Sequence, residues 1–297
     1  MREEEFPLVS VLIPCYNHAH YVVETLDSIV ADDYPVKELV IINDGSRDNS
    51  DQVIRNWILS HDHLINIRYH ARENLGICKT LNELVQMAKG AYLVFIASDD
   101  VLIPGSIKPR VEFLMQQRGK MVVVADAEVM DEQGNKTMES TIVNYNGGDK
   151  DLFRSDEGFL FSTLKRWQIS GPTVMVDKNA YQITGLYHEN LLAEDTYFYQ
   201  RAAMFRLMCF LDIKVSRYRE HRGNNSGSVV WGSPVRAMDF AKVYWYNWRD
   251  LPGLRFKIMG AIELFKWILR YFFYSMRPLY HAYLWMKTKF AGKHSMS

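Results

Sequence analysis

The sequence contains few cysteines, and its positive and negative charges balance. Only three cysteines occur in 297 residues, at positions 15, 78 and 209, and no C-x-x-C spacing is present. This excludes a disulfide framework and a cysteine-based structural zinc site, and it predicts a reducing compartment. The chain starts with Met-Arg-Glu-Glu-Glu, which has none of the apolar character of a secretory signal, so no signal peptide is expected.

Two glycine-rich phosphate-binding patterns are also missing. Neither G-x-G-x-x-G nor G-x-x-x-x-G-K-[ST] occurs in the sequence. Both patterns surround a diphosphate with backbone N–H groups and a helix N-terminus. Their absence excludes a nicotinamide-dependent dehydrogenase. A site for a nucleotide diphosphate would therefore need another positive charge, such as a divalent metal ion held by carboxylates.

Apolar residues are abundant enough to build a large core. They make up 48% of the chain, and charged residues make up 24%. These proportions are typical of a globular protein, and the length allows one large domain or two smaller ones.

The first hundred residues alternate between strand-like and helix-like segments. The strand-like segments are 9–13, 38–42, 66–69 and 91–96, and the helix-like segments between them are 21–30, 51–59 and 79–88. Successive strand ends lie 29, 27 and 27 residues apart, which is about one β-α-β unit each. We therefore predict an α/β fold with a Rossmann-like, mostly parallel sheet flanked by helices. Ligands of such sheets bind at the carboxyl ends of the strands.

The pattern becomes less regular in the second half. The predicted elements there are helices at 104–117 and 193–205, strands at 121–125 and 169–176, a hairpin-like turn at 131–135 and a loop at 146–149.

The last 45 residues are basic and aromatic. Residues 253–297 hold eight Lys or Arg side chains against a single acid, Glu263, together with eleven aromatic residues. Lys266, Arg270 and Arg277 interrupt the apolar positions, so this segment is not expected to span a membrane. Its helical pattern favours a helix lying on an anionic membrane surface. The alternative is helices packed on the protein body with their cations extended toward water.

Three polar clusters follow predicted strands. They are Pro14-Cys15-Tyr16-Asn17, Asn43-Asp44-Gly45-Ser46 and Ser98-Asp99-Asp100. Each cluster has an ordinary explanation: a turn at Asp44, a helix cap at 98–100, or loop packing at Tyr16. Because the carboxyl ends of parallel strands meet at one sheet edge, the joint placement favours a binding site with carboxylates for a divalent metal.

Four segments carry a resemblance to a known family. They are 9–17, 41–46, 74–76 with Asn82, and 95–100. These segments resemble the family 2 glycosyltransferases of GT-A fold, closely over 7–110 and more loosely to about 226. The nucleotide-binding residues that the resemblance implies are Pro14, Tyr16, Asn17, Asp44, Asn74, Gly76 and Asp99. Among these, Asp44 is expected to accept from a uracil-like imide and Asp99 to meet the ribose.

The resemblance also implies a metal site for Mn²⁺ or Mg²⁺. Asp100 is the expected ligand on the diphosphate, although many family members carry an additional aspartate at the position of Ala97. His221, in a His-x-x-Asn-x-Ser segment similar to one in many members, is a candidate third ligand that suits Mn²⁺ better than Mg²⁺. A loop histidine hydrogen-bonded to backbone is the alternative for His221.

The expected catalytic base is Asp195. Glu194-Asp195 begins the predicted helix 193–205 and looks like the family's Glu-Asp motif, and a carboxylate can take the proton of an attacking hydroxyl. Without the resemblance, two acids that favour a helix N-terminus would be the preferred explanation. Ser170-Gly171-Pro172 is expected to shape the acceptor side.

These features together predict the domain organisation. We expect a GT-A catalytic domain at 1–230, with a nucleotide-binding half at 1–110 and an acceptor-side half at 111–230. An amphipathic helical extension, which we expect to associate with a membrane, follows at 231–297.

The predicted function is inverting, metal-dependent transfer of a hexose or N-acetylhexosamine from a UDP-sugar. The expected acceptor is a glycan, such as a polyprenyl-diphosphate-linked or lipooligosaccharide glycan, in bacterial surface polysaccharide (O-antigen or lipopolysaccharide type) synthesis. We expect a cytoplasmic enzyme, peripheral on the inner face of the membrane, with no nucleic-acid partner; oligomeric state stays open.

Two alternatives belong to other classes. A sugar nucleotidyltransferase should have a glycine-rich basic loop after the first strand, but residues 16–20 are Tyr-Asn-His-Ala-His. A catalytically silent membrane-binding module has no need for Asp44, Asp99, Asp100 and Asp195 together.

Overall fold

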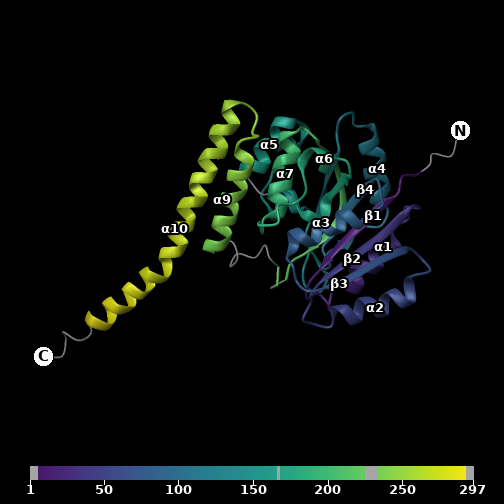
Figure 1. Ribbon diagram of the computed structural model, residues 1–297, viewed down its shortest axis with the longest axis horizontal. Helices are drawn as coiled ribbons and strands as arrows, with labels where there is room; N and C mark the ends of the chain where they lie inside the picture. The colour runs from purple at the N-terminus through teal and green to yellow at the C-terminus, as the bar shows by residue number, and fades with distance from the viewer. Residues whose placement is uncertain (1–5, 166–167, 222, 225–232, 292–297) are drawn as a thin grey trace. The chain divides into compact units, whose positions relative to one another are not determined.

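The computed structural model describes residues 6–165, 168–221, 223–224 and 233–291, with 277–291 in backbone only. The chain divides into two compact units (Figure 1). The first extends to His221 without 191–193, and the second comprises 191–193 and the residues from 222 onward. The sheet of the first unit takes strands from both predicted halves of the catalytic domain, 1–110 and 111–230, whereas 191–193 and 222–230 belong to the second unit.

The centre of the first unit is a nine-stranded sheet, counted over the described residues. The strands are β1 (Val9–Cys15), β2 (Lys37–Asp44), β3 (Asn66–Arg72), β4 (Tyr92–Phe95), β5 (Val101–Leu102), β6 (Val122–Met130), β7 (Lys136–Met138), β8 (Val174–Asp177) and β9 (Met208–Arg219). Their order is β3-β2-β1-β4-β8-β6-β9-β5, with β7 paired to β6. Strands β3, β2, β1 and β4 are mutually parallel, whereas β8 is antiparallel to both of its neighbours.

Helices cover the sheet. In the first unit they are α1 (Val22–Ala31), α2 (Ser50–His61), α3 (Ile77–Met87), α4 (Ile107–Gln116), α5 (Asp156–Lys165), α6 (Ala180–Thr184) and α7 (Glu194–Met204), with short η1 (Thr141–Tyr145), η2 (Lys150–Arg154) and η3 (Gly171–Thr173). Helices α1, α2 and α3 are the crossovers between the parallel strands, close to the predicted ranges. The mostly parallel, helix-flanked sheet confirms the predicted fold class.

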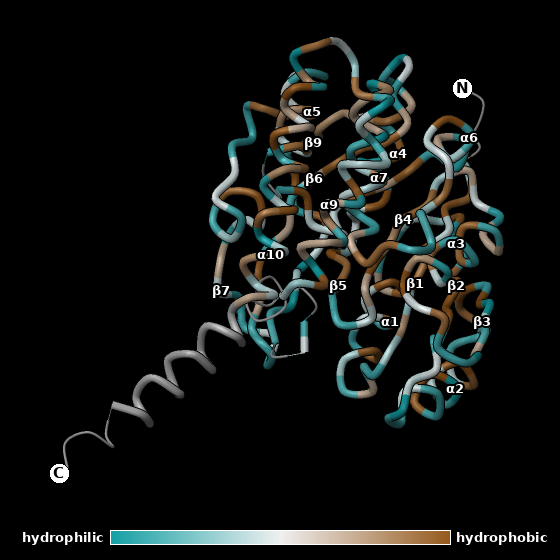
Figure 2. The backbone as a smooth tube through the Cα atoms, turned by 60° about the vertical axis from the view of Figure 1, so that its left-hand side comes forward, coloured by the Kyte–Doolittle hydropathy of each residue, from teal (hydrophilic) through white to brown (hydrophobic). Residues whose placement is uncertain are grey.

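The central strands β1 and β2 are buried almost throughout, which explains their nearly continuous apolar sequences. Val11 and Ile13 of β1 and Leu39 and Ile41 of β2 are fully buried in the main core, and these strands are strongly hydrophobic in Figure 2. Residue Cys15 of β1 pairs with Asn43 of β2. The two strands therefore end at the same level, and the loops after them emerge at one edge.

The prediction for the second half was incomplete. The sequence analysis did not predict strand β9 or helix α5. Strand β9 contains charged residues among its apolar ones. It is formed by hydrogen-bonded pairing with β6 and β5. The predicted strand 169–176 shortens to β8 because Pro172 lies in η3, and proline has no N–H to donate to a strand ladder.

The second unit is built on α9 (Pro234–Trp248) and α10 (Gly253–Ala291), which lie side by side (Figure 1). The Ser233 side chain caps α9 by accepting the N–H of Arg236, and proline occupies the first turn. The carboxylate of Asp239, in α9, accepts the N–H groups of Leu192 and Ala193. Among the described residues, no helix is both long enough and apolar enough to cross a lipid bilayer.

Candidate active site

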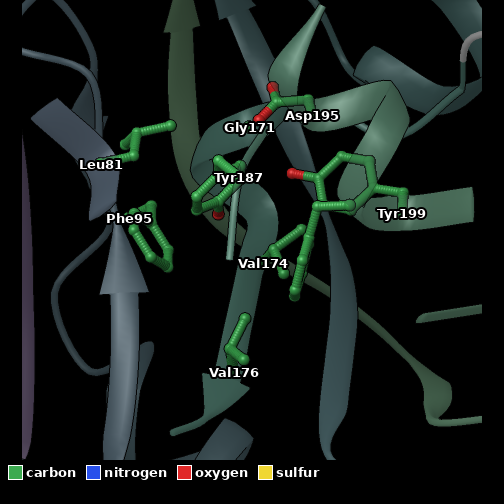
Figure 3. A pocket seen from close by; sticks show the side chains of 9 residues that line it. Leu81, Phe95, Gly171, Val174, Val176, Tyr187, Asp195 and Tyr199 are labelled. Carbon is green, nitrogen blue, oxygen red and sulfur yellow. The ribbon is translucent and has the colours of Figure 1, made fainter. Parts of the chain in front are cut away.

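Asp195 is the second residue of α7, and its carboxylate faces an apolar pocket (Figure 3). The pocket is lined by Leu81, Phe95, Gly171, Val174, Val176, Tyr187, Phe198 and Tyr199 besides Asp195 itself. Burial raises the pKa of Asp195 to about 6, because a low-dielectric environment disfavours the ionised carboxyl. The structure thus places the predicted base where a carboxylate is more basic than usual.

Gly171 lies beside this carboxylate. A Cβ atom added to Gly171 would lie 3.4 Å from Asp195 Oδ2, so the Ser170-Gly171-Pro172 segment borders the carboxylate. Within the described part of the chain, no hydrogen bond is assigned to the Asp195 side chain. The pocket wall is held by Asn82, whose amide donates to the carbonyl of Tyr187 and accepts its N–H, each at 2.9 Å.

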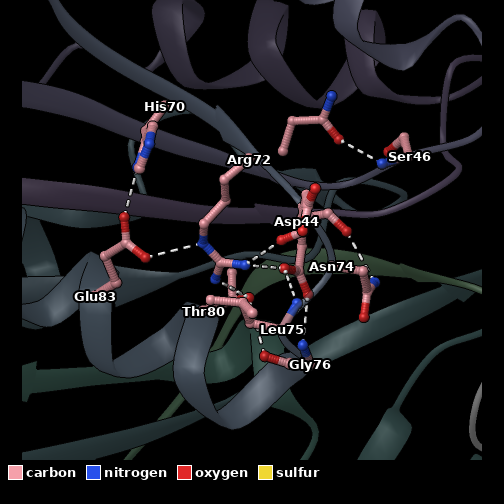
Figure 4. A network of polar contacts seen from close by, with 11 residues as sticks. Asp44, Ser46, His70, Arg72, Asn74, Leu75, Gly76, Thr80 and Glu83 are labelled. Atoms are coloured by element: carbon pink, nitrogen blue, oxygen red, sulfur yellow. Dashed lines mark hydrogen bonds and ion pairs between the residues drawn. The ribbon is translucent and has the colours of Figure 1, made fainter.

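Asp44 is the last residue of β2, and it lies in a network of polar contacts (Figure 4). Its carboxylate accepts the N–H of Leu75 at 2.9 Å and of Gly76 at 3.0 Å, and it forms an ion pair with Arg72. The side-chain amide of Asn74 donates to the Asp44 carbonyl at 2.8 Å. The structure thus brings together Asp44, Asn74 and Gly76, as the sequence predicted.

Arg72 fixes the orientation of this carboxylate. The Arg72 guanidinium also contacts Glu83 and Thr80, each at 2.9 Å, and His70 lies 2.5 Å from the other Glu83 oxygen. Because the guanidinium is bound on several sides, it has little freedom to move away from Asp44. A carboxylate has about four acceptor positions, so Asp44 keeps acceptor capacity for a ligand N–H.

Gly45 permits the close approach of the two segments in this network. Its φ is +68°, and an added Cβ would lie only 2.4 Å from the backbone nitrogen of Asn74. A side chain at this position would therefore have to push the 73–76 segment away from Asp44.

We expect Gly45→Ala to lower the free energy of unfolding by about 3 kcal/mol, because it combines backbone strain with a steric clash. Gly105→Ala is the matched control, since Gly105 has φ +76° but nothing within 4 Å of an added Cβ, and should cost only about 1 kcal/mol. Urea denaturation of both variants measures the difference. Equal losses would show that the approach to Asn74 is unimportant.

The loop after β1 is tied to the loop after β2. The N–H of Asn17 donates to Ser46 Oγ at 2.9 Å, and Asn17 Oδ1 accepts the N–H of Arg47 at 2.7 Å. Pro14 is partly buried in β1, and Tyr16 is 40% exposed, so the Tyr16 ring offers a surface on which a planar base can stack. Asn17 therefore fastens the loop after β1 to the loop after β2, and this role is additional to any contact with a ligand.

Asp99 lies between two histidines from distant parts of the chain. Asp99 Oδ2 is 2.9 Å from His221 Nε2, and Asp99 Oδ1 is 3.7 Å from His18 Nδ1. The three residues each offer one ligand atom, and these atoms all lie within 4.8 Å of one another. They form a candidate metal site that we call the His-Asp-His group.

The chemistry of the His-Asp-His group fits a divalent metal ion. Burial lowers the pKa of His18, partly opposed by the charge of Asp99, which favours the neutral imidazole that binds metals. Two imidazoles with one carboxylate suit Mn²⁺ better than Mg²⁺, which prefers oxygen ligands.

Asp99 and Asp100 are adjacent in the sequence but lie in different surroundings. Asp100 is 1% exposed and belongs to no such group among the described residues; its Oδ1 accepts the N–H of Arg219 at 2.8 Å. Burial, followed by the charge of Asp99, raises the pKa of Asp100 well above its usual range. The carboxylate beside His221 is that of Asp99, because the turn after β4 directs the neighbouring Asp100 into the interior.

Arg219, two positions before His221 in the sequence, is a buried cation. It is 1% exposed. Its guanidinium donates to the Asp99 carbonyl at 2.8 Å and to Glu24 at 2.5 Å, and it lies over the Tyr21 ring. Arg219 therefore anchors the Asp99–Asp100 turn. Arg222 and the end of the His-x-x-Asn-x-Ser segment lie outside the described residues.

The sequence analysis assigned no role to His18. Its position after the first strand, next to Tyr16 and Asn17, was the available signal. Its proximity to His221 depends on contacts between residues far apart in the sequence, which spacing alone does not reveal.

The chain belongs to glycosyl transferase family 2, whose family model matches residues 10–180, more than half of its length. This confirms the resemblance seen in the sequence. An uncharacterized glycosyltransferase of Rickettsia felis is 31% identical over 192 residues, which cover 64% of this chain and 30% of that protein. The poly-beta-1,6-N-acetyl-D-glucosamine synthase of Staphylococcus epidermidis is 35% identical over 94 residues, covering 32% of this chain and 22% of the synthase.

Solved structures show the same fold. TarS 1–349 of S. aureus, in complex with UDP-GlcNAc, superimposes with a TM-score of 0.63 at 19% identity, covering 91% of this chain and 73% of that one. The mannosyltransferase PcManGT from Pyrobaculum calidifontis, in complex with GDP-Man and Mn²⁺, has a TM-score of 0.63 at 17% identity, covering 96% and 80%. The first unit therefore has the GT-A glycosyltransferase fold.

Proposed function

We propose that this chain is an inverting, metal-dependent glycosyltransferase that transfers a sugar from a nucleotide diphosphate to a hydroxyl group. The observation that carries the proposal is the Asp195 carboxylate, which has a pKa of about 6 and lines an apolar pocket together with Gly171. Two further carboxylates lie at strand ends of the same sheet: Asp44 is the last residue of β2, and Asp99 follows β4.

The proposed reaction is a single displacement. The acceptor oxygen forms a bond to the anomeric carbon of the donor while the bond from that carbon to the diphosphate oxygen breaks. The hydroxyl proton moves to Asp195, which is largely ionised at neutral pH yet more basic than an ordinary aspartate.

The remaining residues bind the donor. Asp44, held by Arg72, accepts the imide N–H of the base, and Tyr16 stacks on the base. His18, Asp99 and His221 are the residues that would hold the divalent ion. A bound ion at this place supplies positive charge that stabilises the departing diphosphate.

We propose a UDP-sugar carrying a hexose or N-acetylhexosamine as donor. The acceptor oxygens of Asp44 match the imide of uracil, and TarS was solved with UDP-GlcNAc; the mannosyltransferase bound to GDP-Man makes a guanosine donor the alternative to test. We propose a glycan acceptor, lipid-linked, in surface polysaccharide synthesis. The S. epidermidis relative is named a poly-beta-1,6-N-acetyl-D-glucosamine synthase, which supports the glycan part of this proposal.

The test is nucleotide release from a panel of UDP- and GDP-sugars, with Mn²⁺, Mg²⁺ or a chelator. We expect release of UDP from one sugar, about tenfold faster with Mn²⁺ than with Mg²⁺ because of the two imidazoles. The same assay includes nucleoside triphosphates with sugar phosphates. Release of inorganic diphosphate from that pair would instead identify a sugar nucleotidyltransferase. Absence of metal-dependent nucleotide binding would favour the silent membrane-binding module.

A further inference from the structure

Helix α10 has a row of exposed large apolar side chains along one face. The row consists of Leu254, Ile258, Ile262, Phe265, Leu269, Phe272, Phe273 and Met276, which are 46% to 75% exposed. Seven of them recur every three or four residues, and Phe273 directly follows Phe272. At 100° per residue all eight fall within about 100° of one another, on one face of the α-helix. We call these eight side chains the apolar row.

The opposite face of α10 is already packed within the second unit. Phe256 is 8% exposed, and the Trp267 ring stacks on Phe240 of α9 with ring centroids 4.5 Å apart. A Cβ atom added to Gly260 would lie 2.5 Å from Leu251 Cδ1, which shows how closely the chain approaches there. The apolar row is therefore additional to the side chains that hold α9 and α10 together.

Basic side chains border the apolar row. At 100° per residue, Arg255, Lys266 and Arg270 fall along one edge of it. Lys266 is 51% exposed and pairs with Glu263 at 2.9 Å, and Glu263 is the single acid against eight cations in the sequence 253–297. An apolar face bordered by cations is complementary to a lipid surface with negative headgroups.

A second copy of the helix is a poorer partner for the same row. Two such helices would bring basic segments together, with a single acid in each for compensation. The positions beside a coiled-coil seam usually hold pairs of Glu and Lys, whereas here the positions beside the apolar row include Ala261 and Ile268.

We infer that α10 is an interfacial helix that docks the protein on an anionic membrane, with the apolar row at the boundary between headgroups and acyl chains. This interaction does not rest on the proposed function, because it involves neither the His-Asp-His group nor Asp195. It is also compatible with the absence of a membrane-spanning helix among the described residues.

The test is co-sedimentation of the full chain with phosphatidylcholine vesicles containing roughly 30% phosphatidylglycerol. We expect Phe265→Ser/Leu269→Ser/Phe272→Ser to reduce the partition coefficient about a hundredfold, because three apolar side chains no longer enter the bilayer. The matched control is Leu59→Ser/Leu64→Ser/Met115→Ser, three side chains in the first unit that are 79%, 55% and 65% exposed. The partition coefficient of this control should stay within about twofold of that of the wild type.

A charge variant tests the electrostatic part separately. Lys266→Gln/Arg270→Gln should weaken binding to the anionic vesicles about 25-fold and leave binding to pure phosphatidylcholine unchanged. Circular dichroism establishes that each variant is folded. The inference is overturned if the wild type does not bind anionic vesicles, or if the serine variant binds them as well as the control does. A dimer interface on the apolar row would also overturn it. In that case the wild type is a dimer without lipid, and the serine variant is a monomer that binds vesicles as well as the wild type does.

Discussion

Asp195→Asn is expected to slow sugar transfer about a thousandfold while leaving nucleotide binding unchanged. Asparagine keeps the size of the side chain but cannot accept the hydroxyl proton, and general bases of this kind contribute about a hundred- to ten-thousandfold. The measurement combines single-turnover transfer with calorimetric titration of the nucleotide. Retained transfer would remove Asp195 from the role of base.

Glu194→Gln is the matched control for this variant. Glu194 shares the first turn of α7 with Asp195, so both acids interact alike with the helix dipole. We expect this variant to keep most of the activity. If both variants kept most of their activity and lost the same free energy of unfolding, the only role of the two acids would be to stabilise the N-terminus of α7.

The pH dependence of transfer should report the same carboxylate. Because burial raises the pKa of Asp195 to about 6, the rate should fall as the pH is lowered through about 6, where the base becomes protonated. With a base that had the ordinary pKa of an aspartate, the rate of transfer would be maintained down to about pH 4. A profile without a step near pH 6 would contradict the environment seen in Figure 3.

Asp99→Asn is expected to weaken Mn²⁺ binding about a hundredfold or more, whereas Asp100→Asn should leave it nearly unchanged. Asp99 faces His18 and His221, but Asp100 is buried and accepts the N–H of Arg219. An asparagine oxygen can accept the same N–H. Electron paramagnetic resonance of Mn²⁺ titrated into each variant measures the difference without requiring turnover. The opposite ranking of the variants would restore Asp100 as the ligand.

The sequence predicted the surroundings of Asp44 well. The apolar strands β1 and β2 and their regular spacing indicated a parallel sheet, and this placed Asp44 at its carboxyl edge before any contact was known. The turn glycines and Asn74 followed from the resemblance, and the structure shows them around the same carboxylate. Local patterns are sufficient here because each residue directly follows a strand or begins a helix.

What the sequence determined by itself is the family, the parallel sheet and the set of polar residues at its edge, since these depend on periodicity and short motifs. Only the tertiary structure decided which of the adjacent Asp99 and Asp100 faces the histidines, that His18 joins them, and that Arg219 is buried. The physical reason is that burial and side-chain direction at a turn are set by packing against distant segments. Asp100 is turned inward by Arg219 of β9, a strand that forms only by pairing with β6 and β5.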